Sequence, residues 1–294
     1  MYIDGVFSGG GIKGLALVGA CAAIEEQGFR FKRVAGTSAG SIIAGLLAAG
    51  YTSAEMADIL DGIDLKKLLD PRKTFFPSAL TKWLFVYWRL GLYKGDELEC
   101  WIEEVLAARG LRTFGDLAPG CLRIIASDLT NGRILVLPDD LPKYGIDPLT
   151  FPVAKAIRMS SSLPFFFEPV KLRDRVGTNI VVDGGVLSNF PMWLFDQDKM
   201  LKMRPVLGVK LSQNLIQQPK KNIKNALQLF DALFDTMKDA HDSRYISRKH
   251  EKNIIFIPME ESLTTEFQLT DEKKQELIKL GKNSAEKFFK SWHY

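Results

Sequence analysis

The stretch Gly36-Thr37-Ser38-Ala39-Gly40 reads G-x-S-x-G and lies between a short apolar run, Phe31 to Ala35, and an apolar helical run, Ser41 to Ala49. A strand, a sharp turn and a helix form the context in which this motif is a nucleophile elbow. Both glycines suit so tight a turn, because a Cβ would block its backbone angles and the close approach of neighbouring segments. The pattern predicts Ser38 as a nucleophile near a helix N-terminus, where free N–H groups favour negative charge.

Alternating strand and helix signals surround this turn. Tyr2 to Phe7 has strand character and is followed by a glycine-rich loop and a helix from Leu15 to Gln27. This order predicts an α/β fold with a mostly parallel central sheet and helices on both faces. We expect irregular chain from Asp61 to Gly95. The other predicted strands are Leu122 to Ala126, Ile134 to Leu137 after an Asn131-Gly132 turn, Ile180 to Val182, Val206 to Leu211 and Ile254 to Ile257. The other predicted helices are about 52–60, Asp96 to Arg109, Phe151 to Met159, about 222–249 and Asp271 to Trp292.

The composition is that of an ordinary globular protein. The chain has 294 residues, of which 46% are hydrophobic and 25% charged, and a net charge of +4. It is long enough to bury a full core. Apolar runs continue on both sides of the best candidate linker, Gln213 to Lys221, so we expect one domain over 1–294 with a helical C-terminal part, 213–294. The mild charge and the lack of a zinc-finger spacing, an RNP-like motif or a dense basic block argue against a nucleic-acid partner.

The cysteines and the N-terminal residues indicate the compartment. Cys21, Cys100 and Cys121 are odd in number and far apart, which is no disulfide framework and no metal site. They favour a reducing compartment. The N-terminus has no basic region followed by an apolar one, and no apolar run approaches the ~20 residues of a membrane span. We expect a cytoplasmic protein with no signal peptide or transmembrane segment, which is compatible with transient association with a membrane.

The loop Gly9-Gly10-Gly11-Ile12-Lys13-Gly14 contains G-x-G-x-x-G between a strand and a helix. This is the context of a dinucleotide-binding loop, but that interpretation requires an acidic residue at the end of the second strand, which reads Val34-Ala35-Gly36. The alternative is an oxyanion hole, in which the N–H groups of Gly9 to Gly11 point at a developing negative charge. Lys13 adds positive charge nearby. A tight turn without a ligand explains one or two glycines well and three consecutive ones poorly.

A serine hydroxyl needs a base to take its proton. The three histidines are His241, His250 and His293; the first two lie in charged helical sequence and the third is second-last, so surface positions are favoured and a triad is not supported. Asp183 ends the predicted strand Ile180 to Val182. Sites in open α/β sheets form at the carboxyl ends of strands, so we expect Asp183 to meet Ser38. A plain Asp-Gly turn is the competing interpretation.

Together these motifs resemble those of the patatin-like phospholipase family. The resemblance rests on the glycine loop, the Ser38 turn and Asp183-Gly184-Gly185, in this order. It covers about Met1 to Ser212, and the remainder carries no diagnostic motif. Three further blocks resemble those of the family: Ser160-Ser161-Ser162-Leu163-Pro164, Phe167-Glu168-Pro169 and Asn189-Phe190-Pro191.

The resemblance implies a three-layer patatin-like fold and hydrolysis of fatty-acyl esters in phospholipids or related lipids through an acyl-enzyme. Ser38 would be the nucleophile, Asp183 the base of a dyad without histidine, and Gly9 to Gly11 the oxyanion donors. Lys13 stands where many members have arginine, and both residues are cationic. Gly14, Gly36, Gly40, Gly184 and Gly185 would support these motifs, and neither a metal nor a cofactor is expected.

Two aromatic stretches are less easily interpreted. Trp83 to Trp88, with Tyr93 and the flanking Lys82 and Arg89, suits a lip at a membrane surface, and a buried helix packed on the sheet explains it equally. For Phe165 to Phe167 the core is favoured over a wall of the acyl pocket. Three other functions stay open: an acyltransferase using Ser38, a non-catalytic lipid-binding protein and a dinucleotide-binding oxidoreductase.

Overall fold

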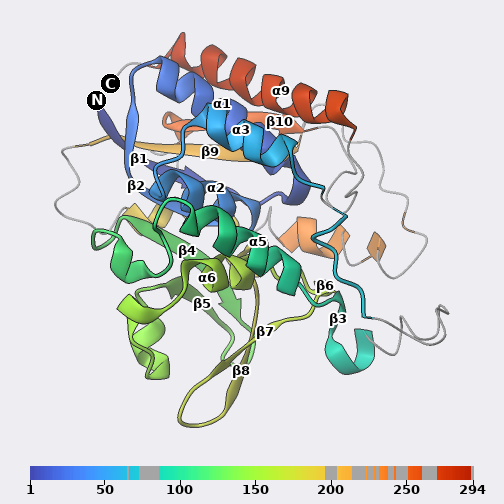
Figure 1. The fold of residues 1–294 in the computed structure, drawn as a ribbon. Coiled ribbons are helices and arrows are strands. Elements are labelled where there is room, and N and C mark those ends of the chain that lie inside the picture. The colour runs from blue at the N-terminus through green and yellow to red at the C-terminus, as the bar shows by residue number, and fades with distance from the viewer. Residues whose placement is uncertain are drawn as a thin grey trace.

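The computed structural model describes residues 1–64, 66–72, 86–195, 204–213, 223, 228–229, 232–237, 242, 251–259 and 270–292. Within these residues the chain forms one eight-stranded mixed sheet and a separate two-stranded sheet, with helices packed against the large sheet (Figure 1). The predicted α/β fold with a mostly parallel central sheet is therefore confirmed.

The large sheet has the strand order β10-β9-β1-β2-β4-β8-β7, and β5 also pairs with β4. The five strands from β10 to β4 run parallel, whereas β8 is antiparallel to β4 and to β7, and β5 is antiparallel to β4. The strands span β1 Tyr2–Phe7, β2 Arg30–Thr37, β4 Leu122–Asp128, β5 Arg133–Leu137, β7 Val170–Arg173, β8 Thr178–Asp183, β9 Val206–Gln213 and β10 Ile254–Met259.

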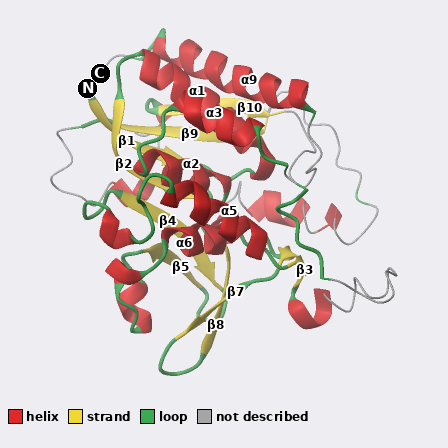
Figure 2. Ribbon diagram, viewed as in Figure 1, coloured by secondary structure: helices red, strands yellow, loops and turns green. Residues whose placement is uncertain are grey.

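Six longer helices lie in the described ranges, and α1 and α9 pack side by side over β9 and β10, as Figure 2 shows. Further along, α2 covers the strands β1, β2 and β4, and α5 packs against α6, which lies over β4 and β8. The helices span α1 Leu15–Glu26, α2 Ala39–Ala48, α3 Ser53–Asp61, α5 Asp96–Ala107, α6 Val153–Ser160 and α9 Asp271–Phe289, with short 3-10 turns that include η1 Gly11–Gly14, η5 Gly184–Val186 and η6 Met192–Phe195.

Alternation along the strands divides the core between the two faces of the sheet. On β1, Ile3 and Phe7 belong to the large cluster beneath the helices, whereas Val6 faces a smaller cluster that includes Phe190 and Phe195. Successive side chains of a strand point to opposite faces, so both faces of β1 are buried. This double burial explains why the central strands read as apolar runs in the sequence.

Several predicted elements are confirmed, and three short strands were missed. The hairpin at Asn131-Gly132 joins β4 to β5, and Thr270 caps α9 by accepting a hydrogen bond from the Lys273 N–H (3.3 Å). Inside the stretch expected to be irregular, β3 (Gly91–Tyr93) pairs with β6 (Phe165–Phe167), a contact between segments far apart in the chain, and β7 was also not predicted. Most of the helix expected at about 222–249 lies outside the described residues.

Candidate active site

Ser38 occupies a strained turn between β2 and α2. Its backbone angles are φ 53° and ψ −126°, a positive φ that residues with a Cβ adopt at a cost. The flanking glycines permit this turn by close approach. A Cβ on Gly36 would lie 2.2 Å from the Gly40 carbonyl oxygen, and a Cβ on Gly40 would lie 2.4 Å from the Phe7 carbonyl oxygen. The turn has the geometry of the predicted nucleophile elbow, with the serine at its tip.

The Ser38 hydroxyl donates a hydrogen bond to Asp183, with 2.6 Å between Oγ and Oδ2. Asp183 is almost fully buried and closes β8, and its other oxygen, Oδ1, accepts a hydrogen bond from the Gly185 N–H at 2.7 Å. Both carboxylate oxygens therefore accept hydrogen bonds, as an ionised carboxylate does. The predicted meeting of Ser38 and Asp183 is confirmed, and the geometry allows proton transfer from the hydroxyl to the carboxylate.

Ser38 and Asp183 do not meet in the way that a parallel sheet would bring them together. In an all-parallel sheet, the carboxyl ends of the strands would bring them to one edge. β8 instead runs antiparallel to β4, so that Asp183 pairs with Ala126. β2 runs parallel to β4 on its other side, where Thr37 pairs with Ile125. Ser38 and Asp183 thus arrive from opposite directions at the same level of β4, the strand that separates them.

The glycine loop lies directly against Ser38. A Cβ on Gly9 would lie 3.0 Å from the Ser38 Cβ, and the Gly9 N–H donates to the Asn189 carbonyl oxygen at 3.2 Å. This bond commits the Gly9 amide, one of the three predicted oxyanion donors, to holding the loop. Gly10 and Gly11 begin the 3-10 turn η1, and their N–H groups are not donated to any described residue. These two amides are available for an anion beside Ser38.

Three serines hold the backbone of Ser38 and Asp183 in place. The Ser38 N–H donates to the Ser160 Oγ (2.8 Å), and the Ser41 hydroxyl donates to the Ser38 carbonyl oxygen (2.6 Å). The Asp183 N–H donates to the Ser162 carbonyl oxygen (2.9 Å). Sequence reasoning quoted Ser160 and Ser162 within a motif block but assigned them no role, because a contact with Ser38 or Asp183 cannot be read from their spacing.

A buried ion pair supports the glycine loop from the C-terminal part of the chain. Lys210 on β9 pairs with Asp242, and the Asn189 side-chain amide donates to the same Asp242 oxygen at 3.2 Å. All three residues are at least nine-tenths buried. Since the Asn189 carbonyl holds Gly9, this chain of contacts links Asp242 to the loop beside Ser38. Nothing in the sequence around Asp242 indicated this position.

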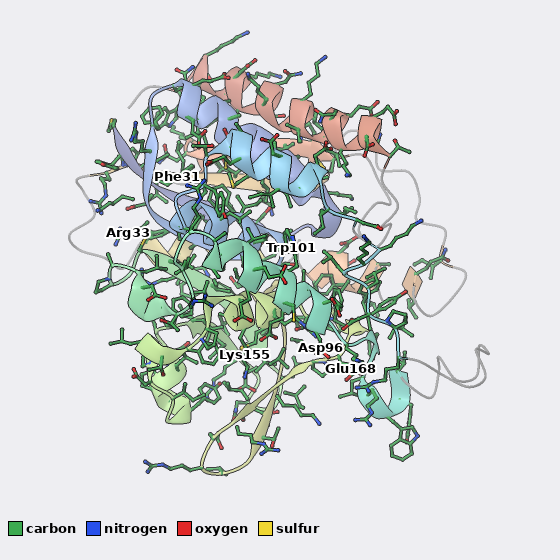
Figure 3. The ribbon with its side chains drawn as sticks, in the orientation of Figure 1. Phe31, Arg33, Asp96, Trp101, Lys155 and Glu168 are labelled. Atoms are coloured by element: carbon green, nitrogen blue, oxygen red, sulfur yellow. The ribbon has the colours of Figure 1, made fainter. Side chains whose placement is uncertain are left out.

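Ser38 and Asp183 lie at the polar end of an apolar cavity of about 150 Å³. Ser38, Asp183, Gly10 and Gly11 line one part of it. An apolar cavity of about this size in another protein stays dry and takes up benzene. Away from Ser38 and Asp183, the walls are formed by α2, α3, the segment after α3 and α5 through Ile42, Leu60, Ile63, Leu68, Leu98 and Trp101. Figure 3 labels Trp101 on α5.

The fold, the elbow and the order of the three motifs invite comparison with known proteins. The patatin-like phospholipase family matches residues 5–196, about two thirds of the chain. The chain belongs to the patatin-like phospholipase family.

This patatin-like protein has relatives in bacteria and viruses. It is 58% identical, over the whole of both chains, to the uncharacterized protein YqhO of Bacillus subtilis strain 168. It is 26% identical over 197 residues to the probable lipid hydrolase 463L of Invertebrate iridescent virus 6, covering 64% of this chain and 61% of that one. Among solved structures, VipD from Legionella pneumophila superposes with a TM-score of 0.59 at 18% identity, covering 99% of this chain and 67% of that one, and shares the fold.

A buried arginine, Arg158, supports one wall of the cavity in this patatin-like protein. Arg158 on α6 donates hydrogen bonds to the carbonyl oxygens of Lys94, Gly95 (2.8 Å) and Glu168 (2.9 Å), and burial lowers the pKa of its guanidinium. Arg158 thereby ties α6 to the ends of β3 and β6. Phe166 and Phe167 of β6 line the cavity and pack in the core, whereas Phe165 is exposed, so the core position expected for the whole run is wrong for Phe165. Glu168 also pairs with Arg72, with 2.6 Å between Oε1 and the Arg72 Nε.

The described residues contain no group of three or more His, Cys, Asp or Glu side chains placed to hold a metal ion. The three histidines weighed as bases, His241, His250 and His293, lie outside the described residues, as do Trp83 and Lys82 of the aromatic stretch. None of the helices in the described ranges is long and apolar enough to cross a membrane.

Gly9→Ala is expected to lower kcat by about 10²-fold, because its Cβ would lie 2.6 Å from the Asn189 Oδ1 and would press on Ser38. The initial rate of ester hydrolysis at saturating substrate concentration measures this change in kcat. Gly177→Ala in the β7–β8 turn is the matched control, since nothing lies within 4 Å of its added Cβ. Equal rates for both variants would show that the Gly9 loop tolerates displacement and does not position the dyad.

Proposed function

We propose that the protein is a lipid acyl hydrolase that cleaves fatty-acyl ester bonds through Ser38, Asp183 and an acyl-enzyme. The observation that carries this proposal is the 2.6 Å hydrogen bond between Ser38 and Asp183 at the polar end of an apolar cavity. The family and the name of the viral relative, a probable lipid hydrolase, support the same class of substrate.

In the proposed reaction, the Ser38 Oγ attacks the ester carbonyl carbon while Asp183 takes the hydroxyl proton. The carbonyl oxygen becomes negatively charged and is stabilised by the N–H groups of Gly10 and Gly11. Asp183 then passes the proton to the oxygen of the leaving alcohol as the ester bond breaks. A water molecule, deprotonated by Asp183, attacks the acyl-enzyme, and the fatty acid leaves as Ser38 regains its proton.

A lone carboxylate is a weak base toward serine, since an unperturbed aspartate titrates at about 3.9. Two features of the site compensate. Two backbone amides with fixed positions stabilise the oxyanion, and each such donor is worth about 2.7–4 kcal/mol. Asp183 also already accepts the hydrogen bond of the hydroxyl whose proton it must take, so no reorganisation precedes the transfer.

The proposal is tested by incubating the full chain with a fatty-acyl ester and identifying the products. We expect wild-type protein to release free fatty acid and a fluorophosphonate probe to label Ser38, and Ser38→Ala to do neither. Release of fatty acid by Ser38→Ala would contradict the proposal. Acyl transfer to an added alcohol in place of water would identify an acyltransferase instead.

We also propose that an exposed apolar tip contacts the lipid surface. Tyr87 and Trp88 are each 73% exposed, and Leu90 and Phe165 beside them are also exposed. Leu90 and Phe165 both have positive φ, 63° and 64°, an unusual and strained conformation for bulky residues. Strain of this kind persists where the surrounding structure holds it and often marks functional positions.

The small sheet connects this tip to the cavity. Leu90 precedes β3, and Gly91 of β3 pairs with Phe165 of β6, whose next two residues line the cavity. Tyrosine and tryptophan suit the membrane–water interface, and the exposed Arg89 suits anionic head groups. A bilayer in contact with the tip would therefore lie beside the wall that leads to Ser38.

Tyr87→Ala/Trp88→Ala is expected to weaken binding to vesicles of mixed zwitterionic and anionic phospholipid by about tenfold, because two interfacial side chains are lost. Co-sedimentation with the vesicles measures this, and hydrolysis of a dispersed short-chain ester should not change. Tyr2→Ala is the control, since Tyr2 is exposed but opens β1, away from β3 (Figure 1). If the double variant and wild type bind the vesicles equally well, the exposed tip does not contact the lipid surface.

A further inference from the structure

Three consecutive serines follow one another at the end of α6, and two of them have satisfied hydroxyls. Ser160 Oγ donates to the Ile125 carbonyl oxygen (2.6 Å) and accepts from the Ser38 N–H. Ser162 Oγ donates to the Arg158 carbonyl oxygen (2.7 Å) and accepts from the Arg158 guanidinium. Both hydroxyls therefore serve the local structure.

Ser161 differs from both neighbours. The residue is only 9% exposed, and its hydroxyl has no hydrogen-bond partner among the residues that the structure describes. Leaving a buried polar group without a partner is unfavourable, and native proteins leave few of them. Ser161 also lines the cavity that contains Ser38 and Asp183. A buried hydroxyl that pairs with no described residue, in the wall of a substrate cavity, points to a partner on the substrate.

The position of Ser161 indicates which half of the ester it faces. The oxyanion donors Gly10 and Gly11 lie on another segment, and the apolar walls suit the acyl chain. Ser161 lies between the two residues that hold the dyad, Ser160 at Ser38 and Ser162 at Asp183. In the proposed reaction Asp183 delivers the proton to the leaving oxygen, so the alcohol half of the ester lies on the Asp183 side of the site.

We infer that Ser161 is a specificity residue that hydrogen-bonds a second oxygen on the alcohol half of the substrate. The ligand class is an acyl ester of a polyol such as glycerol, in which the carbon next to the ester carries an oxygen. A simple alkyl ester lacks this oxygen and leaves the hydroxyl unpaired. This inference rests on the proposed hydrolase function and adds the preference for the alcohol.

The test compares two esters of the same fatty acid, one with glycerol and one with n-propanol, using wild type and Ser161→Ala. Wild type is expected to have the higher kcat/KM for the glycerol ester. Ser161→Ala is expected to lower kcat/KM for the glycerol ester by about threefold to tenfold, the worth of one neutral hydrogen bond, and to leave the propyl ester unchanged. Its thermal midpoint should be equal or higher, because no protein partner is lost.

Ser160→Ala provides the matched control from the same block. Its hydroxyl holds the nucleophile, so both esters should lose kcat/KM by the same factor. Equal losses on both esters in Ser161→Ala, no loss on either, or a lowered thermal midpoint would overturn the inference while the hydrolase function stands. If wild type cleaves neither ester and no fluorophosphonate labels Ser38, the proposed function fails, and the inference fails with it.

Discussion

Asp183→Asn is expected to lower kcat for ester hydrolysis by about 10³-fold or more, because the amide keeps the shape of the carboxylate but cannot take the Ser38 proton. The Ser38 hydroxyl is bonded to the oxygen that would accept this proton, 2.6 Å away. The rate of fluorophosphonate labelling of Ser38 should fall in parallel, since it depends on the same activation. Initial rates of fatty-acid release and labelling under single-turnover conditions measure the two effects.

Asp139→Asn is the control for this substitution, because Asp139 is an exposed aspartate that pairs with Arg123 and does not line the cavity. It should retain wild-type activity. If Asp183→Asn keeps more than about a tenth of the wild-type kcat, Asp183 is not the base. Ala substitutions at His241, His250 and His293 would then identify the group that replaces it.

Gly281→Ala is expected to lower the free energy of unfolding by about 2 kcal/mol or more, because α1 and α9 cross with their backbones in contact. A Cβ on Gly281 would lie 1.8 Å from the Ala16 carbonyl oxygen, and a Cβ on Gly19 would lie 1.8 Å from the Ile278 carbonyl oxygen. The higher helix propensity of alanine, worth about 1 kcal/mol, offsets only part of the overpacking. Urea unfolding followed by circular dichroism measures the change.

Gly62→Ala, at the end of α3, is the matched control. Its φ of −71° is ordinary, and its added Cβ would make only a 3.4 Å contact with the Asp58 carbonyl oxygen. This variant should lie within about 0.5 kcal/mol of wild type or be slightly more stable. A Gly281→Ala protein as stable as Gly62→Ala would show that α9 can move away from α1 without loss of core packing. Since α9 lies outside the residues 5–196 matched by the family, the pair of variants also measures how far the core depends on the C-terminal part.

Local signals were sufficient for much of the fold and for selecting Ser38 and Asp183, which lie within hydrogen-bonding distance of each other. The G-x-S-x-G turn required a strand before it and a helix after it, and β2 and α2 are in these places. Because the central strands are buried on both faces, they form continuous apolar runs in the sequence and could be predicted from them. The Asp183 turn could be selected because a serine acting as a nucleophile needs a base, and the sequence favours surface positions for all three histidines.

Other features of the site could not be read from the sequence because they depend on long-range pairing. The three-residue strands β3 and β6 are too short to show a periodic pattern, and they form through a contact across more than 70 residues of chain. The antiparallel direction of β8 depends on how the chain returns to β4. Asp242 supports the glycine loop through Asn189, and neither residue carries a local signal for the other.

Sequence by itself determined the chemistry that is available: a serine in a turn that only glycines permit, a glycine-rich loop before it and an aspartate at a strand end. These are local requirements of backbone geometry, and they leave a local pattern. Tertiary structure alone decided that Asp183 reaches Ser38 across β4, that Gly9 is committed to Asn189, and that the Ser161 hydroxyl pairs with no residue in the described part of the chain. Each of these features depends on which groups pair with each other, and which are left over, once segments far apart in the chain have packed together.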